Sequence, residues 1–160
     1  MDKDYVIVPE SSVVVYSSGE TSVRLNCAGN LTVSGGTLKF ASGNSSLTNG
    51  KLDGAGNIEI TAGGNFTWSG GSIVGSGKIT VDQNANFYAA SSLLDRYLVN
   101  NGSLLINGSS LTLTGGAEGN GNFTIQQGET LELGGNNKSY NLSRNLNNSG
   151  VLRISNARNN

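Results

Sequence analysis

The chain has 160 residues, of which 36% are hydrophobic and 13% are charged, and its formal net charge is −1. The charged share is low beside the roughly 25% of an average soluble domain. A near-zero charge without a Lys/Arg cluster lacks the electrostatic footprint of nucleic-acid binding, so no nucleic-acid partner is expected. No apolar run approaches the roughly 20 residues that span a membrane, so no direct membrane insertion is expected. Val, Ile, Leu and Thr at regular positions argue against a disordered chain.

Two short apolar segments, residues 6–8 and 13–16, stand before the first repeat. Each predicts a strand that pairs with the first coil of the fold, so residues 1–28 are interpreted as a partial N-terminal cap. The single cysteine, Cys27, ends the alternating segment 23–27 and rules out an internal disulfide. We expect Cys27 to be a small core residue.

A five-residue pattern, Gly-x-apolar-x-apolar, then recurs through the chain at spacings of 19 to 29 residues. Its six copies begin at Gly29, Gly56, Gly77, Gly102, Gly121 and Gly150. Two residues before the glycine stands Gly or Asn in every copy but the first. Because Gly and Asn tolerate positive φ, each copy predicts a sharp corner that leads into a short strand.

Further strands follow these corner strands, for example at 38–40, 66–68, 111–113 and 131–133, with weaker ones such as 72–74. Apolar residues alternate with polar ones, which is typical of strands with one buried face. Stacked copies are expected to form one interior column of Leu31, Ile58, Ile79, Leu104, Phe123 and Leu152. The next column would hold Val33, Ile60, Val81, Ile106, Ile125 and Ile154. The predicted fold is an all-β parallel β-solenoid of about six coils of 19–29 residues, one domain over residues 1–160.

Two other folds explain the sequence less well. A leucine-rich repeat would show Leu-x-x-Leu-x-Leu and an asparagine ladder, neither of which is apparent in the sequence. A β-sandwich also has short strands between turns, but it does not explain a corner motif repeated six times.

The segment 91–98 has helical character and a local cluster of charge, so it is interpreted as a side insertion. It would form either a contact loop or a plain loop or short helix over the core.

Residues 65–77 (NFTWSGGSIVGSG) and 111–116 (LTLTGG) resemble repeats of large bacterial surface proteins, notably the β-helical passengers of autotransporters and filamentous adhesins. The resemblance covers residues 29–135 and is one of general style. It implies a right-handed parallel β-helix, export, and adhesion or display in an extracellular or cell-surface location. Such passengers have many more coils, so the chain is expected to be a fragment of a longer protein. Viral tail spikes share this architecture.

The side chains that catalysis requires are sparse. Without histidine, the chain has no Ser-His-Asp triad, Cys-His dyad or His metal site. The acids are scattered, and only Glu59 and Asp82 are placed to approach each other on adjacent coils; both are interpreted as solvated outward residues. No enzymatic activity, cofactor or metal is therefore expected.

The leading hypothesis is a non-enzymatic structural or adhesive module. Its partners would be neighbouring solenoid coils, other copies of itself, or surface glycans. The alternative is a carbohydrate-binding or polysaccharide-cleaving β-helix, and ice binding ranks lower because charged and large side chains interrupt the outward threonine rows. The candidate contact residues are Tyr88, Asp95, Arg96, Tyr97 and Tyr140.

Overall fold

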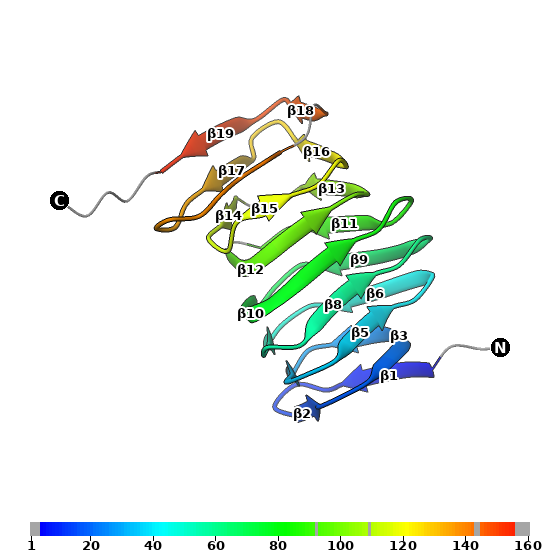
Figure 1. Ribbon diagram of the computed structural model, residues 1–160. Coiled ribbons are helices and arrows are strands. Elements are labelled where there is room, and N and C mark those ends of the chain that lie inside the picture. Colours follow the sequence, from blue (N-terminus) through cyan, green and yellow to red (C-terminus); the bar gives the residue numbers. More distant parts are fainter. Residues whose placement is uncertain (1–3, 92, 109, 143–144, 156–160) are drawn as a thin grey trace.

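The strands of this chain wind into a parallel β-solenoid of about seven coils, stacked along one axis (Figure 1). The computed structural model describes residues 4–91, 93–108, 110–142 and 145–155. None of these residues is helical, so no helix among them could cross a membrane. The predicted all-β solenoid is confirmed, with about seven coils in place of about six.

Each coil passes through three stacks of parallel strands, here called A, B and C. Stack A contains β3 (Glu20–Cys27), β5 (Thr37–Phe40), β8 (Asn57–Ile60), β10 (Ser72–Val81), β12 (Leu93–Asn100) and β15 (Ala117–Glu118). β1 (Asp4–Val8) pairs with residues 23–27 of β3, whose end continues into stack B. Stack B contains β6 (Gly43–Leu47), β9 (Gly64–Trp68), β11 (Asn86–Ala89), β13 (Ser103–Ile106), β16 (Asn122–Ile125) and β18 (Leu146–Asn148). Stack C contains β2 (Val13–Tyr16), β4 (Asn30–Val33), β7 (Lys51–Asp53), β14 (Leu111–Leu113), β17 (Thr130–Leu133) and β19 (Val151–Ile154).

The long strands bend from one stack into the next. The first residues of β10 and β12 pair within stack C, where Ile73 lies beside Leu52 and Leu94 beside Leu113. Their last residues pair within stack A. β3 likewise pairs with β5 at its start and with β6 at its end.

The core fills the space between the three stacks, and its residues are the apolar members of each alternating strand. Phe40, Phe66 and Phe87 form a row of tilted rings with centroid distances of 4.8 and 5.4 Å. Trp68 stacks on Phe87 at 6.3 Å. Such offset aromatic contacts add stabilisation beyond the burial of their surface. Cys27 is buried as predicted, and burial raises the pKa of its thiol.

The predicted inward positions are confirmed in five of the six Gly-x-apolar-x-apolar copies, in which both apolar residues are buried. The sixth copy differs, because Leu152 is only partly buried and Ile154 is 70% exposed. Both lie on β19, whose only strand partner among the described residues is β17. Coverage from one side leaves the apolar side chains of β19 open to solvent.

The predicted grouping of the six copies into common columns is wrong. Ile58 and Ile79 are neighbours in stack A, whereas Leu104 and Phe123 are neighbours in stack B. Leu31 and Leu152 both lie in stack C, in different coils. The motif marks the strand that follows a corner, and each coil has three corners. Only the intervals of 21 residues (Gly56 to Gly77) and 19 residues (Gly102 to Gly121) therefore join equivalent corners of successive coils.

The prediction of a side insertion at 91–98 is also wrong, because residues 93–98 belong to β12. Leu94, Arg96 and Leu98 point inward and are buried. Their spacing of two residues is the alternation of a strand. A charged residue at one inward position disguised this alternation in the sequence.

The two N-terminal apolar segments pair with the first coil as expected. β1 lies beside β3, and β2 lies beside β4. Their outward side chains are apolar too: Tyr5, Ile7, Val13 and Val15 are each more than half exposed.

We expect Ile125→Asp to abolish cooperative folding, because it would place a charge at a fully buried position without a partner. The loss in the free energy of unfolding should exceed about 4 kcal/mol. Thr124→Asp, one residue away and facing outward, should change it by less than about 0.5 kcal/mol. Urea unfolding followed by circular dichroism compares the two. Greater damage from Thr124→Asp would show that the register is inverted.

Candidate functional site

A row of asparagines runs up the outer surface of stack B, one from each of three successive coils. Asn44, Asn65 and Asn86 are register partners at the start of β6, β9 and β11. The Asn65 Nδ2 donates to the Asn44 Oδ1 at 3.2 Å, and the Asn86 Nδ2 donates to the Asn65 Oδ1 at 2.8 Å. The expectation of no asparagine ladder was therefore wrong, although the ladder belongs to a β-solenoid and not to a leucine-rich repeat.

The ladder stops at the next coil, where Ser103 occupies the equivalent position. Its side chain is too short to bridge Asn86 below and Asn122 above. Within the described residues, Asn122 makes no side-chain hydrogen bond, and no donor reaches the Asn86 Oδ1. The interruption thus leaves amide groups without partners on an outward face.

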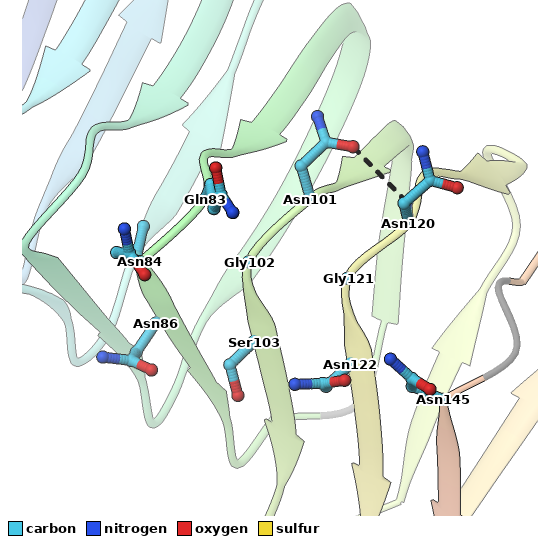
Figure 2. A pocket seen from close by; sticks show the side chains of 11 residues that line it. Gln83, Asn84, Asn86, Asn101, Gly102, Ser103, Asn120, Gly121, Asn122 and Asn145 are labelled. Carbon is cyan, nitrogen blue, oxygen red and sulfur yellow. Dashed lines mark hydrogen bonds between the residues drawn. The ribbon is translucent and has the colours of Figure 1, made fainter.

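These amides line a groove of about 520 Å³ at the corner between stacks A and B, here called the amide groove (Figure 2). One side of the groove carries the strand-start residues Asn86, Ser103, Asn122 and Asn145. The other side carries the corner residues Gln83, Asn84, Asn101 and Asn120. Seven amide side chains from four successive coils therefore surround one hollow.

The base of the groove is formed by glycines, which have no side chain to fill it. At Gly102, a Cβ would lie 2.3 Å from the Asp82 carbonyl oxygen, and at Gly121 it would lie 2.3 Å from the Gly102 carbonyl oxygen. Both contacts are too close for any side chain, so the corner backbones pack directly on one another. The flanking corner at 82–85 is longer and carries Gln83 and Asn84, which project on one side of the groove (Figure 2).

The groove is polar, and none of the described residues that line it is acidic or basic. Each primary amide offers two N–H donors and one carbonyl acceptor. The site can therefore recognise a neutral group that both donates and accepts hydrogen bonds.

Arg96, predicted to be a contact residue, instead holds the interior together. Its side chain is 1% exposed, and its guanidinium donates to three backbone carbonyls: Val74 at 2.7 Å, and Gly54 and Gly56 at 2.8 Å. Burial lowers the pKa of Arg96 to about 10, with the Asp53 carboxylate acting in the opposite direction, so the group is charged at neutral pH. Arg96 joins its own coil to the two coils before it.

The neighbouring candidates Asp95 and Tyr97 lie beside a second hollow of about 450 Å³, which Arg96 and Lys138 also line. Asp95 is exposed and accepts a hydrogen bond from the Thr114 hydroxyl at 2.8 Å. The Tyr97 ring has the Lys78 ammonium 5.9 Å from its centroid. Desolvation and a hydrogen bond to Glu118 raise the pKa of the Tyr97 hydroxyl. This hollow mixes both signs of charge, unlike the amide groove.

The two remaining candidates have different surroundings. Tyr140 packs against the core, and its hydroxyl lies within hydrogen-bond distance of the carbonyl oxygens of Leu113 and Gly134. Burial raises the pKa of Tyr140. Tyr88 faces outward on β11, between Thr67 of β9 and Leu105 of β13. Of the three candidate tyrosines, only Tyr88 lies on the same outer face as the ladder.

Among the described residues, carboxylates form ion pairs with nearby lysines and are not clustered. Glu59 contacts the Lys39 ammonium at 3.5 Å, and its register partner on the next coil is Thr80, so Asp82 lies two residues further along. Asp53 contacts Lys51 at 2.6 Å, which lowers the pKa of the Asp53 carboxyl. In the part of the chain that the structure describes, no three His, Cys, Asp or Glu residues are placed to hold a metal ion.

Sequence reasoning missed the amide groove because its residues are distant in the chain. The usable signal was the interval of 21 residues between Asn44, Asn65 and Asn86, which equals one coil. That interval becomes meaningful only once the coil length is known.

Known proteins offer no independent assignment for this site. No family model, curated protein or solved structure matches the chain.

We expect Arg96→Met to lower the free energy of unfolding by about 3–5 kcal/mol, because it removes the donors of three hydrogen bonds in a buried charged group. Asp95→Asn, at the exposed neighbouring position, should change it by less than about 0.5 kcal/mol. Urea denaturation measures both variants. Equal stability of Arg96→Met and the parent chain would show that Arg96 does not join the coils.

Proposed function

We propose that this chain is a non-enzymatic structural and adhesive module of an extracellular or cell-surface protein. In this role the stacked core supplies a stiff rod, and one outer face of the rod makes the contact. The observation that carries the proposal is the complete lack of charge on the strands of stack B, from β6 to β18.

Most charged residues within the described strands lie on stacks A and C, and Arg24 on β3 lies below β6 at the foot of stack B. Lys39 and Glu59 face outward on stack A, and Lys51, Glu132 and Arg153 face outward on stack C. The outward rows of stack B differ. Next to the asparagine ladder runs a second row of uncharged residues: Ser46, Thr67, Tyr88, Leu105, Thr124 and Asn147. The rod therefore has one neutral, hydrogen-bonding side.

Such a face suits adhesion. A neutral surface does not repel partners of either charge, and its hydrogen bonds are less sensitive to salt than ion pairs are. The resemblance of residues 29–135 to passengers of surface adhesins supports the same role. Export, surface display and adhesion are part of this proposal.

We expect beads coated with the protein to adhere to a glycosylated cell layer, with little change between about 0.05 and 0.5 M salt. Thr124→Lys, on stack B, should reduce adhesion severalfold because it adds an unpaired charge to the contact face. Thr112→Lys, outward on stack C, is the matched control and should have little effect. Equal loss in the two variants, or adhesion that disappears with salt, would contradict a neutral contact face.

Polysaccharide cleavage is the competing function. A reducing-sugar assay on a panel of polysaccharides tests it directly. No release of reducing ends is expected, and turnover of any polysaccharide would overturn the non-enzymatic proposal.

A further inference from the structure

We infer that the amide groove binds a neutral carbohydrate, a short segment of an uncharged glycan. This inference deepens the proposed adhesive function and rests on it, because it names the ligand class of the contact face.

The amides of the groove differ from those of the ladder in their hydrogen bonding. Where the ladder is complete, as at Asn44 and Asn65, each amide is joined to the next by a hydrogen bond. In the groove, the side chains of Gln83, Asn120 and Asn122 make no hydrogen bond within the described residues. Their donors and acceptors are free for a ligand.

The hydrogen-bonding groups of the groove are complementary to those of a sugar. A sugar hydroxyl both donates and accepts hydrogen bonds, and so does each primary amide. Carboxylate or phosphate ligands call for Arg, Lys or clustered backbone N–H groups, and the lining residues that the structure describes include no Arg or Lys. The lining therefore favours a neutral polyol over an anionic ligand.

The groove has the volume and length of a ligand site. The volume of about 520 Å³ lies within the range of about 300–1,000 Å³ that is usual for ligand sites. The lining spans four successive coils, and three strand spacings of about 4.8 Å give a length of roughly 14 Å. This length fits a short oligosaccharide that runs along the rod axis.

An apolar surface lies beside the groove. Tyr88 is two residues beyond Asn86 on β11, so both side chains point to the same face. Leu105 is the register partner of Tyr88 on β13 and also faces outward. Together they form an apolar surface against which the C–H face of a sugar ring can pack. A glycan that follows stack B would meet amides on one side and this pair on the other.

The test is an NMR titration of the ¹⁵N-labelled protein with neutral tetrasaccharides (mannotetraose, cellotetraose and chitotetraose). A tetramer of galacturonic acid is the anionic comparison. At least one neutral probe should shift the amide signals of residues 83–86, 101–103 and 120–122, and the anionic tetramer should not. Shifts confined to other residues, or produced by the anionic probe alone, would overturn the inference.

Two variants test the role of the unpaired amides. Asn120→Ala combined with Asn122→Ala should raise the Kd of the binding probe about tenfold, from the loss of two neutral hydrogen bonds. Ser103→Asn should complete the ladder, raise the thermal midpoint by about 1–4 °C and weaken binding by a similar factor. Gln126→Ala combined with Gln127→Ala, two exposed amides at another corner, is the matched control and should bind normally. Unchanged affinity in both groove variants would overturn the inference.

The bead assay separates this inference from the proposed function. Beads that adhere equally well with and without the groove variants, or to cells stripped of glycans, would leave the adhesive role standing and remove the carbohydrate site. Beads that do not adhere to any surface would remove the adhesive role itself, whatever the titration shows.

Discussion

Direct stacking of backbone on backbone is the constraint on which the whole structure depends. Successive coils are hydrogen-bonded residue by residue, so equivalent residues must lie about 4.8 Å apart at the corners as well as in the strands. At Gly77 a Cβ would lie 2.0 Å from the Gly56 carbonyl oxygen, and Gly54 and Gly75 have φ values of 107° and 111°. Only glycine meets both demands, which explains a chain with 24 glycines and one proline.

Arg96 shows what happens where a coil departs from this rule. Between Val74 and Lys78, β10 has three corner residues, whereas β12 has only Arg96 between the register partners Asp95 and Tyr97. The shorter corner cannot reproduce the backbone pairing of the coils before it. The Arg96 guanidinium replaces the missing backbone pairing, since it donates hydrogen bonds to carbonyls of two earlier coils. A buried charge is tolerated here because its donors are matched with acceptors.

The sequence predicted the direction of each side chain better than the place of each strand. Alternation of period two fixes which residues point inward, so Ile58 and Phe123 were assigned correctly to the core. It does not distinguish the three corners of a coil, so these two residues were placed in one column although they lie in stacks A and B. At 93–98 the pattern failed because an inward arginine resembles an outward one in the sequence. Its three carbonyl partners lie 22 to 42 residues away in the chain.

The same limit explains why the candidate site was found only in the structure. An asparagine in a ladder and an asparagine in a binding site look alike in the sequence, and what separates them is the residue one coil away. Asn65 has an asparagine on each side and is hydrogen-bonded to both, whereas Asn122 has Ser103 below it and makes no side-chain hydrogen bond within the described residues. A ladder uses one donor and one acceptor of each inner amide for its own hydrogen bonds and leaves fewer for a ligand. Interruption by one short side chain therefore converts a device for stacking coils into a surface that can bind a partner.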